Sequence, residues 1–302
     1  MKVICVGHAA LDRIFTVDSW PADSGKIAAT RYEECGGGMM ANAAVTIARL
    51  GGTALLWGPT GEDAVAAAVR AQLHAEGVDV ENLRGFEGKT TSHSAVLIDR
   101  RGERLVVGYR GSALAAPADW LPLGAVASAD AVMVDVRWPQ GAAAALGAAR
   151  KAGVPSILDG EVAPQDVLDA LTRLADHVVF SERGLAQFGG ADYEGGLRRA
   201  LKHGARVACV TRGKGGALWL EHDAPRALRA CPAVEVPVVD TLGAGDVFHG
   251  AYTLAIAEGD TVGEAIRFAS VAAAIKCTRP GGRAGAPTRA EVMEFLARTE
   301  LA

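Results

Sequence analysis

Short apolar runs of strand length alternate with alanine-rich helical stretches along most of this 302-residue chain. Strands that alternate with helices predict a parallel sheet covered by helices on both faces, which is a three-layer α/β fold. In such sheets a ligand binds beyond the carboxyl ends of the strands. We expect the strands at Val3–Gly7, Ala54–Trp57, Ala131–Asp135, Ser156–Asp159, His177–Phe180 and Val207–Thr211, and the helices at Met40–Leu50, Ala64–Glu76, Gln140–Ala152, Gln165–Ala175 and Tyr193–His203.

Two regions break this alternation, because each holds a pair of strand-like runs with no helix between them. Ile14–Val17 pairs with Ile27–Tyr32, and Ser94–Asp99 pairs with Arg104–Tyr109 across a short turn of the hairpin type. These strands do not fit a parallel sheet, and we interpret them as a small accessory sheet that acts as a lid. The expected core is therefore residues 1–12, 36–90 and 111–302, and the expected lid is residues 13–35 and 91–110.

Charge and cysteine content exclude several classes of protein. Lys and Arg number 31 against 35 Asp and Glu, so no basic excess is present to neutralise a nucleic-acid backbone. No apolar run approaches the roughly 20 residues that span a bilayer. The five cysteines are scattered and never form a C-x-x-C pair, which argues against a disulfide framework or a structural zinc site. We expect a cytoplasmic protein without nucleic-acid or membrane partners.

The segment of residues 238–251 is the most informative for chemistry. We expect a strand that ends at Asp240 and a helix that begins near Ala244. The small residues Gly243, Ala244 and Gly245 would leave main-chain N–H groups free, and the helix N-terminus adds donors and partial positive charge, so the turn suits a phosphate. Asp246 in the first helical turn would repel that phosphate unless it faces an acceptor hydroxyl and takes its proton. A glycine-rich turn with an ordinary first-turn Asp remains the alternative.

Four motifs in chain order carry a resemblance to a known family. Residues 240–250, D-T-L-G-A-G-D-V-F-H-G, resemble the D-T-x-G-A-G-D-x-F signature of the ribokinase-like (PfkB) carbohydrate kinases. Residues 36–44, 58–63 and 211–216 resemble that family's G-G-x-x-x-N-x-A segment, its G-x-x-G-x-D turn and its T-x-G-x-x-G nucleotide loop. The resemblance implies a ribokinase-like α/β/α fold with a mostly parallel sheet and a small β-sheet lid. It also implies phosphorylation of a sugar hydroxyl by ATP with Mg²⁺.

The resemblance assigns roles to individual residues. Asp246 would be the catalytic base, and Gly243, Ala244 and Gly245 would form the anion hole. Asp240 and Thr241 would help to bind a monovalent cation such as K⁺. The family's N-x-x-E magnesium motif would fall on residues 181–184, which read S-E-R-G, so no magnesium ligand is assigned. The expected sugar contacts are Asp12, Gly37, Gly38, Asn42 and His93, and the expected nucleotide contacts are Ser181, Glu182, Thr211, Gly213, Gly216, Gly243 and Gly245.

Residues 24–26, 134–138, 158–160, 180–182 and 277–285 resemble segments of the sulfofructose kinases of this family. The resemblance implies that Lys26 and Arg137 bind an anionic group of the sugar. Arg137 follows an apolar run, where an Arg can bind a tetrahedral anion through several donors. We expect an anionic ketose such as 6-deoxy-6-sulfofructose, with a carboxylate or phosphate sugar also open. The alternatives are a fructokinase, a ribokinase, a keto-deoxy sugar acid kinase, a nucleoside kinase and a non-catalytic sensor of sugar or nucleotide. Exposed lid strands predict a homodimer formed through the lid.

Overall fold

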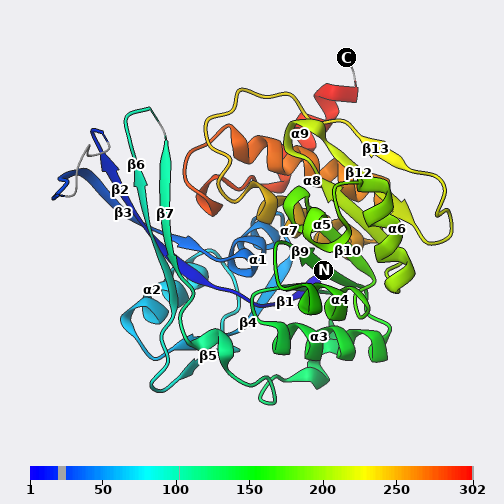
Figure 1. Cartoon of the computed structure of the whole chain (residues 1–302), viewed down its shortest axis with the longest axis horizontal. Helices are drawn as coiled ribbons and strands as arrows, with labels where there is room; N and C mark the ends of the chain where they lie inside the picture. The colour runs from blue at the N-terminus through cyan, green and yellow to red at the C-terminus, as the bar shows by residue number, and fades with distance from the viewer. Residues whose placement is uncertain (20–24, 102, 301–302) are drawn as a thin grey trace.

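A computed structural model describes residues 1–19, 25–101 and 103–300 and contains a nine-stranded sheet and a four-stranded sheet (Figure 1). The nine strands lie in the order β13-β12-β11-β10-β9-β8-β1-β4-β5, and all are parallel except β12 and β13 at one edge. This confirms the expected mostly parallel sheet. The strands are β1 (Lys2–Val6), β4 (Thr53–Gly61), β5 (Leu83–Phe86), β8 (Ala131–Asp135), β9 (Ser156–Gly160), β10 (His177–Ser181), β11 (Val207–Thr211), β12 (Ala217–Glu221) and β13 (Arg229–Cys231).

Helices cover both faces of the large sheet and complete three layers. Val3 and Cys5 of β1 pack into one apolar core, while Ile4 and Val6 of the same strand pack into the other, as the alternation of side chains along a strand requires. None of the described helices is long and apolar enough to cross a membrane. The first core involves α1 (Met39–Arg49), α2 (Ala64–Ala75), α7 (Ala244–Glu258), α8 (Val262–Cys277) and α9 (Arg289–Glu300), and the second involves α3 (Pro139–Ala152), α4 (Gln165–Thr172), α5 (Glu182–Gly189) and α6 (Tyr193–His203).

The two exceptional regions of the sequence join in one small sheet that projects from the helical layers (Figure 1). Its order is β3-β2-β6-β7, with β2 and β6 parallel and the outer pairs antiparallel. The first two strands are longer than expected, so that Asp12 and Gly37 belong to this sheet. Residues 20–24 and 102, within the expected lid, lie outside the described residues. The strands are β2 (Ala10–Val17), β3 (Ala29–Gly37), β6 (Ser92–Ile98) and β7 (Arg104–Tyr109).

The strand order creates a crevice at one end of the large sheet. β1 lies between β4 and β8, so the chain leaves β1 toward one side of the sheet and returns later on the other side. Where strand order reverses in this way, the connections diverge and leave a crevice at the carboxyl ends of the strands. The residues that follow β1 and end β8 therefore face a potential binding site.

One expected strand is absent, because residues 238–240 form an extended loop. Val238 and Val239 are exposed, and the only strand after β12 in the described chain is β13. The amides of Val239 and Asp240 both donate to the carbonyl of Cys277, at 2.8 and 3.1 Å, and not to a neighbouring strand. The C-terminal end of α8 thus accepts the hydrogen bonds that a neighbouring strand would accept in a sheet. These bonds fix the path of the chain into α7.

Candidate active site

Asp246 lies in the first turn of α7, where it meets Asn42 of α1. The turn is possible because Gly243, just before the helix, has a φ of 75°, which an L side chain rarely adopts. The Asn42 side-chain amide donates to Asp246 Oδ2 at 2.6 Å. Asn42 is buried, and its own Oδ1 accepts no hydrogen bond from the described residues. The structure therefore brings together the expected base and an expected sugar contact, with an acceptor oxygen left unused.

The surroundings of Asp246 adjust its proton affinity. Burial raises the pKa of this carboxyl to about 7, the Asp159 carboxylate also raises it, and the hydrogen bond from Asn42 lowers it. A carboxylate with a pKa near neutrality is ionised often enough to accept a proton and basic enough to hold it. The geometry and the pKa are therefore suited to a general base.

Two further buried carboxylates end neighbouring strands of the large sheet. Asp135 ends β8 and accepts hydrogen bonds from the amides of His8, at 2.8 Å, and Arg137, at 2.7 Å. Burial raises the pKa of Asp135 to about 6 and that of Asp159, in β9, well above its ordinary value. Neither residue was predicted as part of the site from the sequence. A carboxylate at or next to the end of an apolar strand is the signal that could have identified both.

The turn before α7 offers main-chain donors for an anion. Within the described chain, the amides of Gly243, Gly245 and Asp246 donate no hydrogen bond to protein. The amide of Ala244, in contrast, donates to the Thr241 carbonyl at 3.2 Å, which corrects the expectation that all small residues of the turn have free donors. Unpaired amides at a helix N-terminus form a favourable site for a phosphoryl group.

A cavity of about 820 Å³ adjoins this turn and reaches the loop after β11. Its size is in the range of small-molecule and cofactor sites. Thr211, Gly213, Gly216 and Gly245 line it, as expected for nucleotide contacts, together with apolar residues that include Val236 and Phe248. Ser181, Glu182 and Gly243, also expected nucleotide contacts, do not belong to its described lining. Ser181 Oγ accepts from the amide of Gly184, and Glu182 accepts from the Tyr193 hydroxyl.

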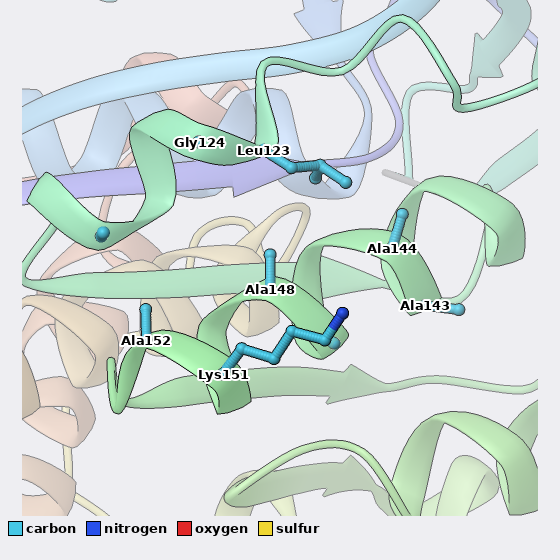
Figure 2. A pocket seen from close by; sticks show the side chains of 9 residues that line it. Leu123, Gly124, Ala143, Ala144, Ala148, Lys151 and Ala152 are labelled. Carbon is cyan, nitrogen blue, oxygen red and sulfur yellow. The ribbon is translucent and has the colours of Figure 1, made fainter.

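A second hollow, of about 690 Å³, lies between the 3₁₀ turn η2 (Leu123–Ser128) and α3 (Figure 2). Alanines, two glycines, Leu123 and Lys151 line it. No residue that the sequence analysis predicted for the site lies there. The cavity beside α7 is therefore the candidate nucleotide site.

Asp12 and the glycines of residues 36–38 come close together at the base of the small sheet. Asp12 Oδ1 accepts a hydrogen bond from the Ser94 hydroxyl, which ties β2 to β6. A Cβ on Gly37 would overlap the Asp12 carboxylate, and Gly38, with a φ of 92°, would place one 2.6 Å from the His8 carbonyl oxygen. His93, on β6, is half-buried, with Nδ1 3.1 Å from the Thr91 carbonyl oxygen.

Positive charge gathers at the crevice beside His8. Burial, with smaller contributions from the charges of Arg137 and Arg110, lowers the pKa of His8 to about 4. His8 Nε2 is buried and has no hydrogen-bond partner among the described residues. Arg137 Nη1 donates to the Val162 carbonyl at 3.0 Å. Lys26 is exposed ahead of β3, and its approach to Arg137 stays a prediction.

The residues expected to bind cations differ in how well they suit that role. In the described part of the chain no three His, Cys, Asp or Glu side chains form a metal cluster. The Asp159 carboxylate raises the pKa of Asp246, and these two negative groups suit a divalent cation carried in on nucleotide phosphates and water. The expected K⁺ site does not fit. The Lys276 ammonium donates to the Asp240 carbonyl at 2.7 Å, and the Thr241 carbonyl accepts from Ala244.

Comparisons with known proteins agree with this arrangement. A family model described as pfkB family carbohydrate kinase matches residues 1–289. An ATP-dependent ribose-1-phosphate kinase of Halopiger xanaduensis is 30% identical over 306 residues, which cover 98% of each chain. A ribokinase of Bacillus subtilis is 28% identical over 98% of this chain and 100% of its own. The solved Arabidopsis thaliana ribokinase, complexed with ribose and ATP, has a TM-score of 0.87 at 26% identity and covers 97% of this chain and 98% of its own.

Replacement of Asp246 by Asn is expected to abolish most turnover and retain nucleotide binding. The amide cannot accept the hydroxyl proton, so kcat should fall by about 10³-fold or more. Because the folded pKa of Asp246 lies above its ordinary value, the ionised carboxylate destabilises the fold as pH rises through about 7. Asp246→Asn should therefore raise the melting temperature at pH 8 but not at pH 4. Near-normal turnover would contradict the role of Asp246 as base.

The hydrogen bond from Asn42 to Asp246 should determine the pH at which kcat/KM falls on the acidic side of the pH–rate profile. Asn42→Leu removes the donor that lowers the pKa of Asp246, so the limb of kcat/KM near pH 7 should move to higher pH. The matched control is Thr46→Ser, one turn along α1, where the hydroxyl bond to the Asn42 carbonyl can be kept. A limb that stays in place in Asn42→Leu would mean that another group titrates.

Proposed function

The chain belongs to the pfkB family of carbohydrate kinases, and on this premise we propose that it transfers the γ-phosphate of ATP to a hydroxyl of a sugar that carries an anionic group. The family supports an ATP-dependent sugar kinase of the ribokinase and fructokinase type. The proposal of an anionic sugar rests on a single observation, that the charges of Arg110 and Arg137 both lower the pKa of His8 beside the crevice.

In the proposed reaction the two sides of the α7 turn have separate tasks. ATP occupies the cavity beside Gly245, with its γ-phosphate at the free amides of Gly243 and Gly245. Asp246 accepts the proton of the attacking hydroxyl, while Asn42 and Asp12 hold sugar hydroxyls. Mg²⁺ bound with the nucleotide would offset the negative charge of the phosphates beside the Asp159 and Asp246 carboxylates. The amides stabilise charge that develops on the transferring group.

The small sheet is suited to the role of a lid. Asp12 and His93 lie on its strands, so that a sugar held by the core would touch both sheets. Closure of such a sheet excludes water, which would otherwise accept the phosphoryl group. The division into the core of residues 1–12, 36–90 and 111–302 and the lid of residues 13–35 and 91–110 is part of this proposal.

The positive cluster near His8 favours a sulfonate, phosphate or carboxylate over a neutral substituent. A guanidinium binds tetrahedral oxyanions through several donors, and a second Arg adds to the attraction. Lys26 would approach the same anion from the small sheet. Sulfofructose is the first candidate, as the similarity of individual segments predicts. Ribose 1-phosphate is the second, because a relative that matches nearly the whole chain is named for it.

Arg137→Ala should reduce kcat/KM for the anionic sugar by about tenfold or more and affect a neutral sugar little. The assay measures ADP release with sulfofructose, ribose 1-phosphate, fructose 6-phosphate, fructose, ribose and a keto-deoxy sugar acid. The control is Arg198→Ala, whose guanidinium pairs with Glu194 on the surface of α6. Equal losses for fructose and sulfofructose would refute the anion contact. Turnover of adenosine alone would favour a nucleoside kinase, and binding without turnover a sensor.

An exposed apolar surface on the small sheet supports the proposed homodimer. Tyr32, Phe15, Leu97 and Leu105 lie side by side across its four strands on one face. Tyr32 and Leu105 are each 52% exposed. A second copy that packs its small sheet on this face would cover both the apolar row and the edge strand β7.

Light scattering during gel filtration should give twice the 31.1 kDa mass of one chain. Leu105→Lys places a charge on the apolar row and should shift the mass to that of a monomer. Val106→Lys is the matched control, since Val106 is equally exposed on the same strand but belongs to the opposite face. A monomeric mass for the wild-type protein would contradict the dimer.

A further inference from the structure

Lys276 places a positive charge in the interior of the protein, away from solvent. It lies near the end of α8, and its side chain is fully buried. Its ammonium donates to the Asp240 carbonyl at 2.7 Å and lies 3.5 Å from the Arg279 carbonyl oxygen and 3.7 Å from Asp240 Oδ2. A buried cation is costly unless oxygen atoms replace its water. Here main-chain carbonyls and a carboxylate do so.

This set of oxygen atoms is the kind that holds a desolvated monovalent cation. Carbonyl oxygens replace the hydration shell of K⁺ in proteins, and an ammonium group presents a compact positive charge to the same oxygens. The family resemblance predicts a monovalent cation at Asp240 and Thr241. In this chain the Asp240 carbonyl already accepts from Lys276, and the Thr241 carbonyl already accepts from Ala244.

The position of the ammonium links it to the turn that begins α7. Asp240 Oδ1 accepts from the amide of Leu242 at 2.8 Å, and Asp240 Oδ2 accepts from the amide of Gly281 at 2.9 Å. Gly243, with its unpaired amide, follows directly after Leu242. The Lys276 ammonium therefore holds Asp240, and Asp240 in turn binds the amides of the two segments that lead to the anion site.

We propose that the Lys276 ammonium is a covalently attached replacement for a monovalent cation, and that this kinase works without K⁺. Lys276 is then a positioning residue. It fixes the Asp240 carbonyl and carboxylate, and through Leu242 it fixes the amides that receive the phosphoryl group. The inference rests on the proposed phosphoryl-transfer site but not on which sugar is phosphorylated.

The first test compares the wild-type enzyme in KCl and in tetramethylammonium chloride at equal ionic strength. The bulky organic cation cannot enter a buried carbonyl site, so it controls for salt. Turnover should differ by less than about twofold, and KCl should not raise the melting temperature of the ligand-free protein relative to the control salt. Saturable stimulation by KCl of about tenfold or more would overturn the proposal.

The second test removes the ammonium. Lys276→Ala leaves the carbonyls and a space beside them, so turnover in tetramethylammonium chloride should fall by about tenfold or more. KCl or NH₄Cl should restore a large part of it and should now raise the melting temperature of the ligand-free protein. Lys276→Met fills the space with an uncharged chain and should be equally impaired but not restored by either salt. The control is Lys151→Ala, at an exposed position of α3.

The melting temperature separates this proposal from the proposed function. It is measured on the protein without sugar or nucleotide, so the cation site can be tested even if no sugar substrate is found. A Lys276→Ala protein that is fully active without K⁺, or one that neither salt affects in activity or melting, would contradict the role of Lys276. If that variant does not fold, wild-type turnover in the two salts still decides whether K⁺ is needed.

Discussion

The placement of β1 between β4 and β8 is the constraint on which the site depends. It makes the connections diverge at one end of a parallel sheet, so that the carboxyl ends of several apolar strands face one crevice. The central strands β1, β8 and β9 are buried, and β8 and β9 carry buried carboxylates near these ends. Asp135 and Asp159 therefore come together without any sequence motif that joins them, and α1 and α7 place Asn42 and Asp246 beside them.

This crevice holds groups that would be unfavourable elsewhere in a folded protein. Burial raises the pKa of Asp135, Asp159 and Asp246, and the unpaired Asn42 Oδ1 and His8 Nε2 lack protein partners among the described residues. Such groups lower stability unless a ligand satisfies them. The free energy of unfolding is therefore smaller than it would be with apolar residues at this end of the sheet. A charged, hydroxyl-rich ligand that pairs with these groups would offset the loss.

The sequence predicted well those features that depend on local pattern. Tyr193–His203 forms a helix with the expected bounds, and α7 begins at the expected Ala244, because capping residues and apolar spacing act over a few residues. Residues 238–240 looked like a strand because valines favour strands. The structure instead bonds their amides to Cys277, a partner distant in sequence.

Non-local contacts explain the remaining differences. The parallel pairing of β2 with β6 joins two regions that the sequence shows only as separate strand pairs. Lys276 stands in the apolar run A-A-A-I-K-C, an anomaly that signals a buried partner but does not identify Asp240. The combined effect of the Arg110 and Arg137 charges on the pKa of His8 likewise depends on how two sheets meet, which no spacing along the chain encodes.

We propose that the amides before α7 receive the phosphoryl group while Asp246 takes the proton of the acceptor. A crystal structure with ADP, aluminium fluoride and the sugar substrate is the decisive test, since the fluoride complex mimics the group in transfer. We expect the amides of Gly243 and Gly245 to bind the fluoride, and an Asp246 oxygen to lie within about 2.6–3.2 Å of the acceptor hydroxyl. A fluoride complex bound away from this turn, or an Asp246 carboxylate out of reach of the sugar, would contradict it.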